Sequence, residues 1–159
     1  HRVDAPYDHV RVDGNNIEWG NNTDALFLGS DSQAQCSFRF AYDERYLYVL
    51  AEYLDEELIP RDNIRLLFSN GQTGEGLFET VISCGFDGKI LTGGEVMASS
   101  YREEGRGYLV EMAIPRIDLP FIEDRVFLYA EIRKVGVTDH FTEMTETQYG
   151  RWMPIRIKQ

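Results

Sequence analysis

The amino-acid sequence predicts an all-β protein, an antiparallel β-sandwich of the immunoglobulin-like or jelly-roll kind with about nine or more strands. Aromatic residues make up 13% of the chain, and they cluster with Val, Ile and Leu in short segments, a composition that favours strands. Within several segments apolar side chains recur at every second position, and no stretch sustains apolar spacing at the helical period. Turn-forming residues separate the segments, as is typical of two packed sheets.

The first predicted hairpin spans residues 37–42 and 47–54. Phe38 and Phe40 share one face of its first strand, which is the pattern of a half-buried strand. The second strand is apolar on both faces, so we expect it in the centre of a sheet. Asp43 begins the turn between the two strands, because an Asp side chain can bond to the nearby backbone and close a turn.

Six further strands are expected at residues 62–69, 77–84, 95–102, 107–115, 126–135 and 152–158. In the first of these Ile64, Leu66 and Phe68 alternate toward the core. Pro115 ends the fourth, and a single helical turn is expected over residues 117–121. The 159 residues match one domain at roughly 100 to 200 residues per domain, so residues 1–159 are expected to form a single β-sandwich domain.

The charge balance argues against nucleic acid and anionic membranes as partners. The chain holds 27 acidic residues against 16 Lys and Arg, a net charge of −11, and a charge of this sign repels phosphate groups when no basic patch is segregated. No apolar run approaches the roughly 20 residues that span a bilayer, so no membrane insertion is expected. The first residues do not form a signal peptide, and the chain begins without Met, as does a piece processed or excised from a longer protein.

Two cysteines, Cys36 and Cys84, permit one disulfide without requiring it. Both fall at strand ends on faces that point toward the expected core. The pattern therefore leaves two alternatives open: a bond that links the two sheets, or two buried thiols.

Four motifs occur in an order that resembles a known family. They are an Asp-Gly followed by Trp19, an Ala-Tyr-Asp turn before Leu47-Tyr48-Val49, the Asp62-Asn63-Ile64 strand, and a Gly-Tyr strand over residues 107–115 that ends Glu-Met-Ala-Ile-Pro. The series resembles the family 9 carbohydrate-binding modules and their DOMON-like relatives, from about residue 13 to residue 157. The resemblance implies an immunoglobulin-like sandwich that binds poly- or oligosaccharide without catalysis, in a secreted, periplasmic or cell-surface protein, with a covalently linked glycan-degrading domain and structural calcium.

The chain departs from this family at the sugar site. Ile59 stands where members that hold sugar between two Trp rings have one of those rings. Arg65 replaces the family's Glu, and Glu79 falls where the family has an Arg, so the two charges are exchanged. We expect Arg65 and Glu79 to pair across neighbouring strands. The alternative function is accordingly a structural or adaptor domain of a larger surface glycan-processing protein, with no sugar site of its own.

Sugar sites need exposed rings beside polar groups, because a pyranose presents an apolar C–H face and a rim of hydroxyls. Trp152 is expected as the exposed ring, with a Trp packed under a loop as the alternative, whereas Trp19 is expected in the core. The candidate carbohydrate-binding residues are Trp152, Tyr149, Arg151, Tyr101, Arg102, Arg65 and Glu79.

Calcium is the cofactor that the resemblance implies, and Asp residues at turns and strand starts could supply its oxygen ligands. The candidates are Asp13, Asp55, Asp62 and Asp87. The alternative is that each of them only forms a turn, which Asp does for backbone reasons.

No constellation of residues predicts catalysis. The acidic residues show no pair in a cleft-like context for glycoside hydrolysis. A Cys–His nucleophile would combine Cys36 or Cys84 with His9 or His140, yet both cysteines lie on core faces. Haem ligation, known among DOMON relatives, would need Met and His together, and Met112 lies on a core face with no His paired to it. We therefore expect a non-catalytic module.

Overall fold

The computed structural model describes residues 2–13, 19, 24–29, 34–55, 63–83, 90–92, 97–103, 107–134, 137–140 and 146–158. Twelve strands are formed within these ranges: β1 (Val3–Pro6), β2 (Ala25–Gly29), β3 (Ala34–Tyr42), β4 (Tyr46–Asp55), β5 (Asn63–Ser69), β6 (Phe78–Ser83), β7 (Ile90–Thr92), β8 (Met97–Glu103), β9 (Gly107–Pro115), β10 (Arg125–Lys134), β11 (Val137–His140) and β12 (Met153–Lys158). Two short 3-10 turns, η2 (Arg116–Asp118) and η3 (Tyr149–Arg151), precede β10 and β12.

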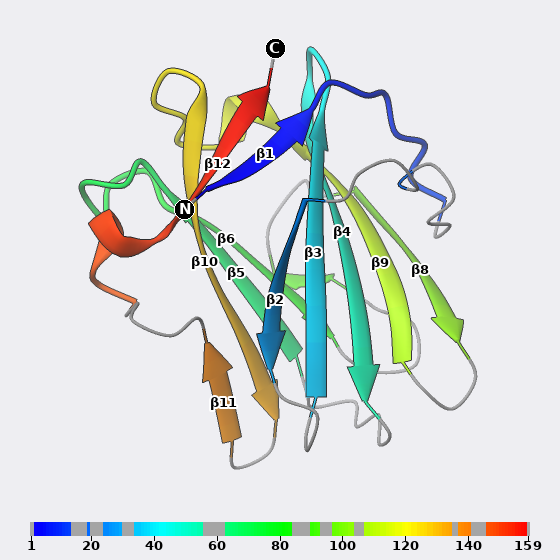
Figure 1. Ribbon diagram of the computed structural model, residues 1–159. Coiled ribbons are helices and arrows are strands. Elements are labelled where there is room, and N and C mark those ends of the chain that lie inside the picture. Colours follow the sequence, from blue (N-terminus) through cyan, green and yellow to red (C-terminus); the bar gives the residue numbers. More distant parts are fainter. Residues whose placement is uncertain are drawn as a thin grey trace.

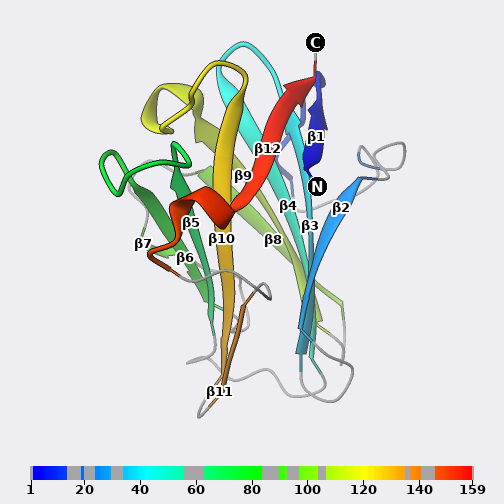
Figure 2. The ribbon, with the colours of Figure 1, turned by 60° about the vertical axis from the view of Figure 1, so that its left-hand side comes forward.

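The strands form two sheets that face each other (Figure 1, Figure 2). The seven-stranded sheet has the order β1-β12-β10-β5-β6-β7, with β11 also paired to β10, and the five-stranded sheet has the order β2-β3-β4-β9-β8. The described strand pairs are antiparallel except for β1 and β12, which run parallel. The predicted all-β sandwich is therefore confirmed.

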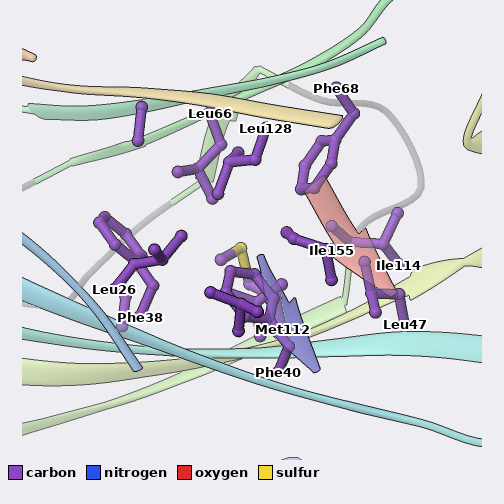
Figure 3. Close-up of a cluster of buried hydrophobic side chains, with 14 of the residues drawn as sticks. Leu26, Phe38, Phe40, Leu47, Leu66, Phe68, Met112, Ile114, Leu128 and Ile155 are labelled. Atoms are coloured by element: carbon purple, nitrogen blue, oxygen red, sulfur yellow. The ribbon is translucent and has the colours of Figure 1, made fainter. Parts of the chain in front are cut away.

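The core lies between the two sheets, where side chains from both meet (Figure 3). Leu66, Phe68 and Leu128 enter it from the seven-stranded sheet, and Phe38 and Met112 enter it from the five-stranded sheet. All five are fully buried. Since successive side chains of a strand point to opposite faces, the residues between these positions lie on the outer faces of the sheets.

A second, smaller core covers part of the outer face of the five-stranded sheet. Val10 and Trp19 pack there on Tyr48 and Leu50 of β4, so β4 is buried on both faces, as its sequence predicted. Trp19 is 4% exposed, and its Nε1 donates to Oε2 of the buried Glu111 at 3.0 Å. The expected burial of Trp19 is confirmed.

Asp43 closes the hairpin between β3 and β4, as predicted. Its Oδ1 accepts from the backbone N–H of Arg45 at 2.8 Å and of Tyr46 at 2.9 Å. Its Oδ2 accepts from the Tyr48 hydroxyl at 2.5 Å and lies 2.9 Å from Nδ1 of His9. Burial acts to raise the pKa of Asp43, but the bonds from Tyr48 and His9 and from the two backbone donors prevail and lower it to about 2.

All eight predicted strands are confirmed to within a few residues, by β3, β4, β5, β6, β8, β9, β10 and β12. The helical turn expected over residues 117–121 corresponds to η2, which begins one residue earlier. The sequence did not predict β1, β2, β7 or β11. Cys36 is buried in β3. Cys84 lies outside the described residues, so whether the two cysteines pair stays a prediction. Among the described residues there is no helix of the length and apolarity needed to cross a membrane.

Candidate functional site

An ion network centred on Arg65 lies on the outer face of the seven-stranded sheet, over β5, β6 and β10. The Arg65 side chain is only 11% exposed. Its Nε donates to Glu79 at 2.7 Å, its Nη2 to Glu146 at 2.7 Å and its Nη1 to Glu131 at 3.3 Å. The predicted pairing of Arg65 with Glu79 is therefore confirmed, and two further carboxylates join it. We call these four residues the Arg65 network.

The strand register explains why Arg65 and Glu79 meet. Ile64 and Leu66 point into the core, so Arg65 points outward. In the β5–β6 ladder Arg65 lies opposite Val81 and Leu67 lies opposite Glu79, which makes Arg65 and Glu79 diagonal neighbours on one face. A long Arg side chain spans such a diagonal.

Glu131 anchors the network to β10. Its side chain is 7% exposed, and Oε1 accepts from Nε of Arg133 at 2.9 Å while Oε2 accepts from the Tyr129 hydroxyl at 2.8 Å. A carboxylate with this little solvent contact is tolerated only when it is paired and hydrogen-bonded. Burial, reinforced by the bond to Glu131, raises the pKa of Tyr129, so the phenol remains a proton donor at neutral pH.

Arg65 and Glu146 stabilise each other's charged forms. Burial acts to lower the pKa of Arg65, but the bonds to Glu146 and Glu79 outweigh it and raise that pKa above its ordinary value. The bond from Arg65 lowers the pKa of Glu146. Arg65 therefore remains a cation that fixes the positions of the carboxylates around it.

Trp152 does not form an exposed platform, so that expectation is wrong and its alternative, a Trp packed under a loop, is confirmed. Its side chain is 1% exposed. It stacks on Tyr129 with the ring centroids 5.5 Å apart and meets Tyr149 edge-on at 5.1 Å. The physical reason is that η3 folds back over the outer face of the sheet, with the Trp152 N–H donating to the Tyr149 carbonyl at 3.2 Å, and thereby covers the indole.

Tyr149 is the half-buried ring above Trp152, and the absence of a side chain at Gly74 leaves room for it. A Cβ on Gly74 would lie 2.6 Å from the Tyr149 hydroxyl oxygen. Glu146 and Tyr149 belong to the same short segment, so the ring and the network lie on one face. Arg151, the third candidate of this segment, is exposed.

The structure thus brings together Arg65, Glu79, Tyr149 and Trp152 from the predicted set. Tyr101 and Arg102 belong to β8 in the other sheet, and their side chains lie outside the description. Of the metal candidates, Asp13 is exposed, and its backbone N–H donates to Glu111 at 3.1 Å.

Of the other metal candidates, Asp62, Asp87 and the side chain of Asp55 lie outside the described residues. Ile59 lies outside them too. Within the described part of the chain, no three His, Cys, Asp or Glu side chains are grouped so that they could hold a metal ion.

Sequence reasoning missed four residues of the site: Tyr129, Glu131, Arg133 and Glu146. The alternation of residues 126–135 places the first three on one face, opposite Val126 and Leu128, so a signal was present. Nothing local marks Glu146, because its partner Arg65 is 81 residues away in sequence.

The site offers fixed polar groups with partly accessible rims. The side chains of Glu79, Glu146 and Arg133 are 41%, 51% and 42% exposed, while their inner atoms are held by the network. Such groups can bond to a ligand's hydroxyls without first becoming ordered, which lowers the entropic cost of binding.

The fold is that of solved family 9 carbohydrate-binding modules. A carbohydrate binding module family 9 from Caldicellulosiruptor kristjanssonii in complex with cellotriose aligns with a TM-score of 0.77 at 16% identity, covering 99% of this chain and 94% of that chain. A family 9 module from the same organism in complex with glucose gives a TM-score of 0.78 at 16% identity, covering 99% and 96%. No family model and no curated protein matches the chain. The fold that the resemblance implied is confirmed.

Proposed function

We propose that this chain is a non-catalytic carbohydrate-binding module and that sugar binds over the Arg65 network beside Tyr149. The observation that carries the proposal is the set of charged side chains fixed around Arg65 and partly exposed at their rims. Through Tyr129 and Trp152 this set is linked to the half-buried ring of Tyr149. The sugar complexes of the two structures that share this fold support it.

The binding chemistry follows from the exposed rims. Glu79 and Glu146 accept hydrogen bonds from sugar hydroxyls, and the guanidinium of Arg133 donates to them. The exposed side of Tyr149 packs on the C–H face of the pyranose, while Trp152 supports Tyr149 from beneath. Trp152 itself does not touch sugar in this arrangement.

One observation favours the second candidate, a structural or adaptor domain. Nε, Nη1 and Nη2 of Arg65 are all engaged by carboxylates, and the indole of Trp152 is covered. A face whose polar groups bond chiefly to one another contributes less to ligand binding. Under this candidate the Arg65 network only holds η3 against the sheet.

The setting belongs to the same proposal. We infer a secreted, periplasmic or cell-surface protein in which this module is linked to a glycan-degrading catalytic domain, because the fold is shared with carbohydrate-binding modules. Structural calcium, with Asp13, Asp55, Asp62 and Asp87 as its candidate ligands, remains part of the proposal.

A glycan-array screen with and without calcium, followed by calorimetry on the best hit, tests the function. Tyr149→Ala and Glu79→Gln should each weaken binding by roughly 10-fold or more, as expected for the loss of a stacking ring or a charge-assisted hydrogen bond. Ile117→Ala and Glu123→Gln, exposed at turns, are the matched controls and should bind like the unaltered chain. Binding that survives both site variants would show that sugar binds elsewhere on the chain. No binding to any glycan would favour the adaptor function.

A further inference from the structure

Phe27 is the central residue of β2 and points away from the core. Its neighbours Leu26 and Leu28 are 4% and 5% exposed, whereas Phe27 is 74% exposed. The residues around it on the outer face are small: Ala25 and Gly29 on the same strand, and Ser37 directly opposite on β3. Because these neighbours are small and the ring is 74% exposed, a face of Phe27 is open to a ligand.

Planar polar side chains flank this ring. In the β2–β3 ladder Gln35 lies opposite Gly29 and Arg39 lies opposite Ala25, so both are diagonal neighbours of Phe27, at roughly 7–8 Å. Nη1 of Arg39 donates to Oε1 of Glu52 at 2.7 Å, which fixes the guanidinium. The side chains of Arg39 and Glu52 are 26% and 29% exposed, so part of each remains accessible to a ligand.

The same face continues onto β4. The strand registers align Phe27, Ser37 and Glu52 in one row from β2 to β4, and beyond Glu52 Leu109 packs against the second core. Two strand spacings of about 4.8 Å make this row roughly 10 Å long.

We propose that the outer face of the five-stranded sheet carries a second sugar-binding surface, centred on Phe27, that takes neutral pyranose rings of a polysaccharide chain. The inference rests on the proposed function and adds a site on the sheet opposite the Arg65 network. Phe27 packs on the C–H face of one pyranose, and Gln35, Arg39 and Glu52 bond to hydroxyls at its rim.

The charges on this face select the class of sugar. Arg39 and Glu52 neutralise each other, and the protein as a whole carries a net charge of −11, so an anionic sugar is repelled at longer range. A neutral chain avoids this repulsion.

Calorimetry of the full chain with cellohexaose, xylohexaose and mannohexaose tests the proposal. For at least one probe we expect two sites on the unaltered chain, one site for Phe27→Ala, one for Tyr149→Ala and none for the double variant. Phe27→Tyr, which retains a ring, should keep both sites. Phe27 is exposed, so the alanine variant should retain the thermal midpoint of the unaltered chain, and a melting curve checks this.

The outcomes separate the two proposals. A chain that binds one hexasaccharide, lost in Tyr149→Ala and unchanged in Phe27→Ala, would overturn the second surface and leave the proposed function standing. No binding of any of the three probes would overturn both. A dimer in light scattering that becomes monomeric in Phe27→Ala would show that this face binds a second copy of the chain instead of sugar.

Discussion

The substitution Asp43→Asn removes the negative charge from the turn between β3 and β4 and keeps the shape of the side chain. In the folded protein the pKa of Asp43 is lowered from an ordinary 3.8 to about 2, and its side chain is only 6% exposed. Each pKa unit corresponds to about 1.4 kcal/mol, so the ionised carboxylate stabilises the fold by about 2 kcal/mol relative to its neutral form. For a chain of this length that loss lowers the thermal midpoint by about 4–8 °C.

The pH dependence gives this prediction its sign. Because the folded-state pKa is lowered, the contribution of Asp43 is complete above about pH 4 and is lost as the pH falls through about 2. The difference in unfolding free energy between the unaltered chain and Asp43→Asn should therefore be largest at pH 5 to 7 and shrink toward pH 2.

Urea unfolding followed by Trp fluorescence at several pH values measures this difference. Asp118→Asn, in the exposed turn η2, is the matched control and should leave stability unchanged. A difference for Asp43→Asn below about 0.5 kcal/mol at pH 7, the usual range of a neutral surface change, or one that is equal at pH 5 and pH 2, would refute the reasoning.

Three further substitutions test the packing. Trp152→Ala should lower the free energy of unfolding in urea by about 3–5 kcal/mol, because the indole is buried and stacked. A near-neutral effect would instead indicate that the indole is exposed. Gly107→Ala, whose Cβ would lie 1.8 Å from a β4 carbonyl oxygen, should prevent folding or lower the midpoint far more than Gly76→Ala, whose Cβ meets nothing closer than 3.8 Å; equal effects would contradict this. Trp19→Phe should cost about 1–3 kcal/mol, because it leaves the buried Glu111 without its indole donor, and rescue by Glu111→Gln is the check.

The strands that the sequence predicted are those with a clear period of two. β5 and β10 alternate apolar core positions with outer-face positions in sequence. Their burial follows this alternation only at the start of each strand, because Leu67, Tyr129 and Glu131 are buried on the outer face as well. β2 was missed because Leu26, Phe27 and Leu28 are consecutive large apolar residues, which hide the difference between a core face and an exposed ring. β11 is short and polar, so its pairing with β10 depends on the neighbouring strand and not on a pattern of its own.

The site shows where local reasoning ends. The alternation that set Trp152 apart from Ile155 and Ile157 was correct, because Trp152 does stack on the outer-face residue Tyr129. Its exposure was misjudged, since the chain folds back over that face, and such a cover depends on contacts distant in sequence. The Arg65–Glu79 pair could be predicted because both residues lie on adjacent strands, where diagonal neighbours share a face.

The parallel pairing of β1 with β12 determines how the sandwich responds to a mechanical load. Val3 lies opposite Ile155 and Pro6 lies opposite Lys158. Opposed forces on the start of β1 and on the end of β12 therefore act along the strands and in opposite directions. The hydrogen bonds of the ladder are then loaded together in shear and are not peeled apart one after another. These opposed forces on β1 and β12 therefore meet cooperative resistance from the whole ladder.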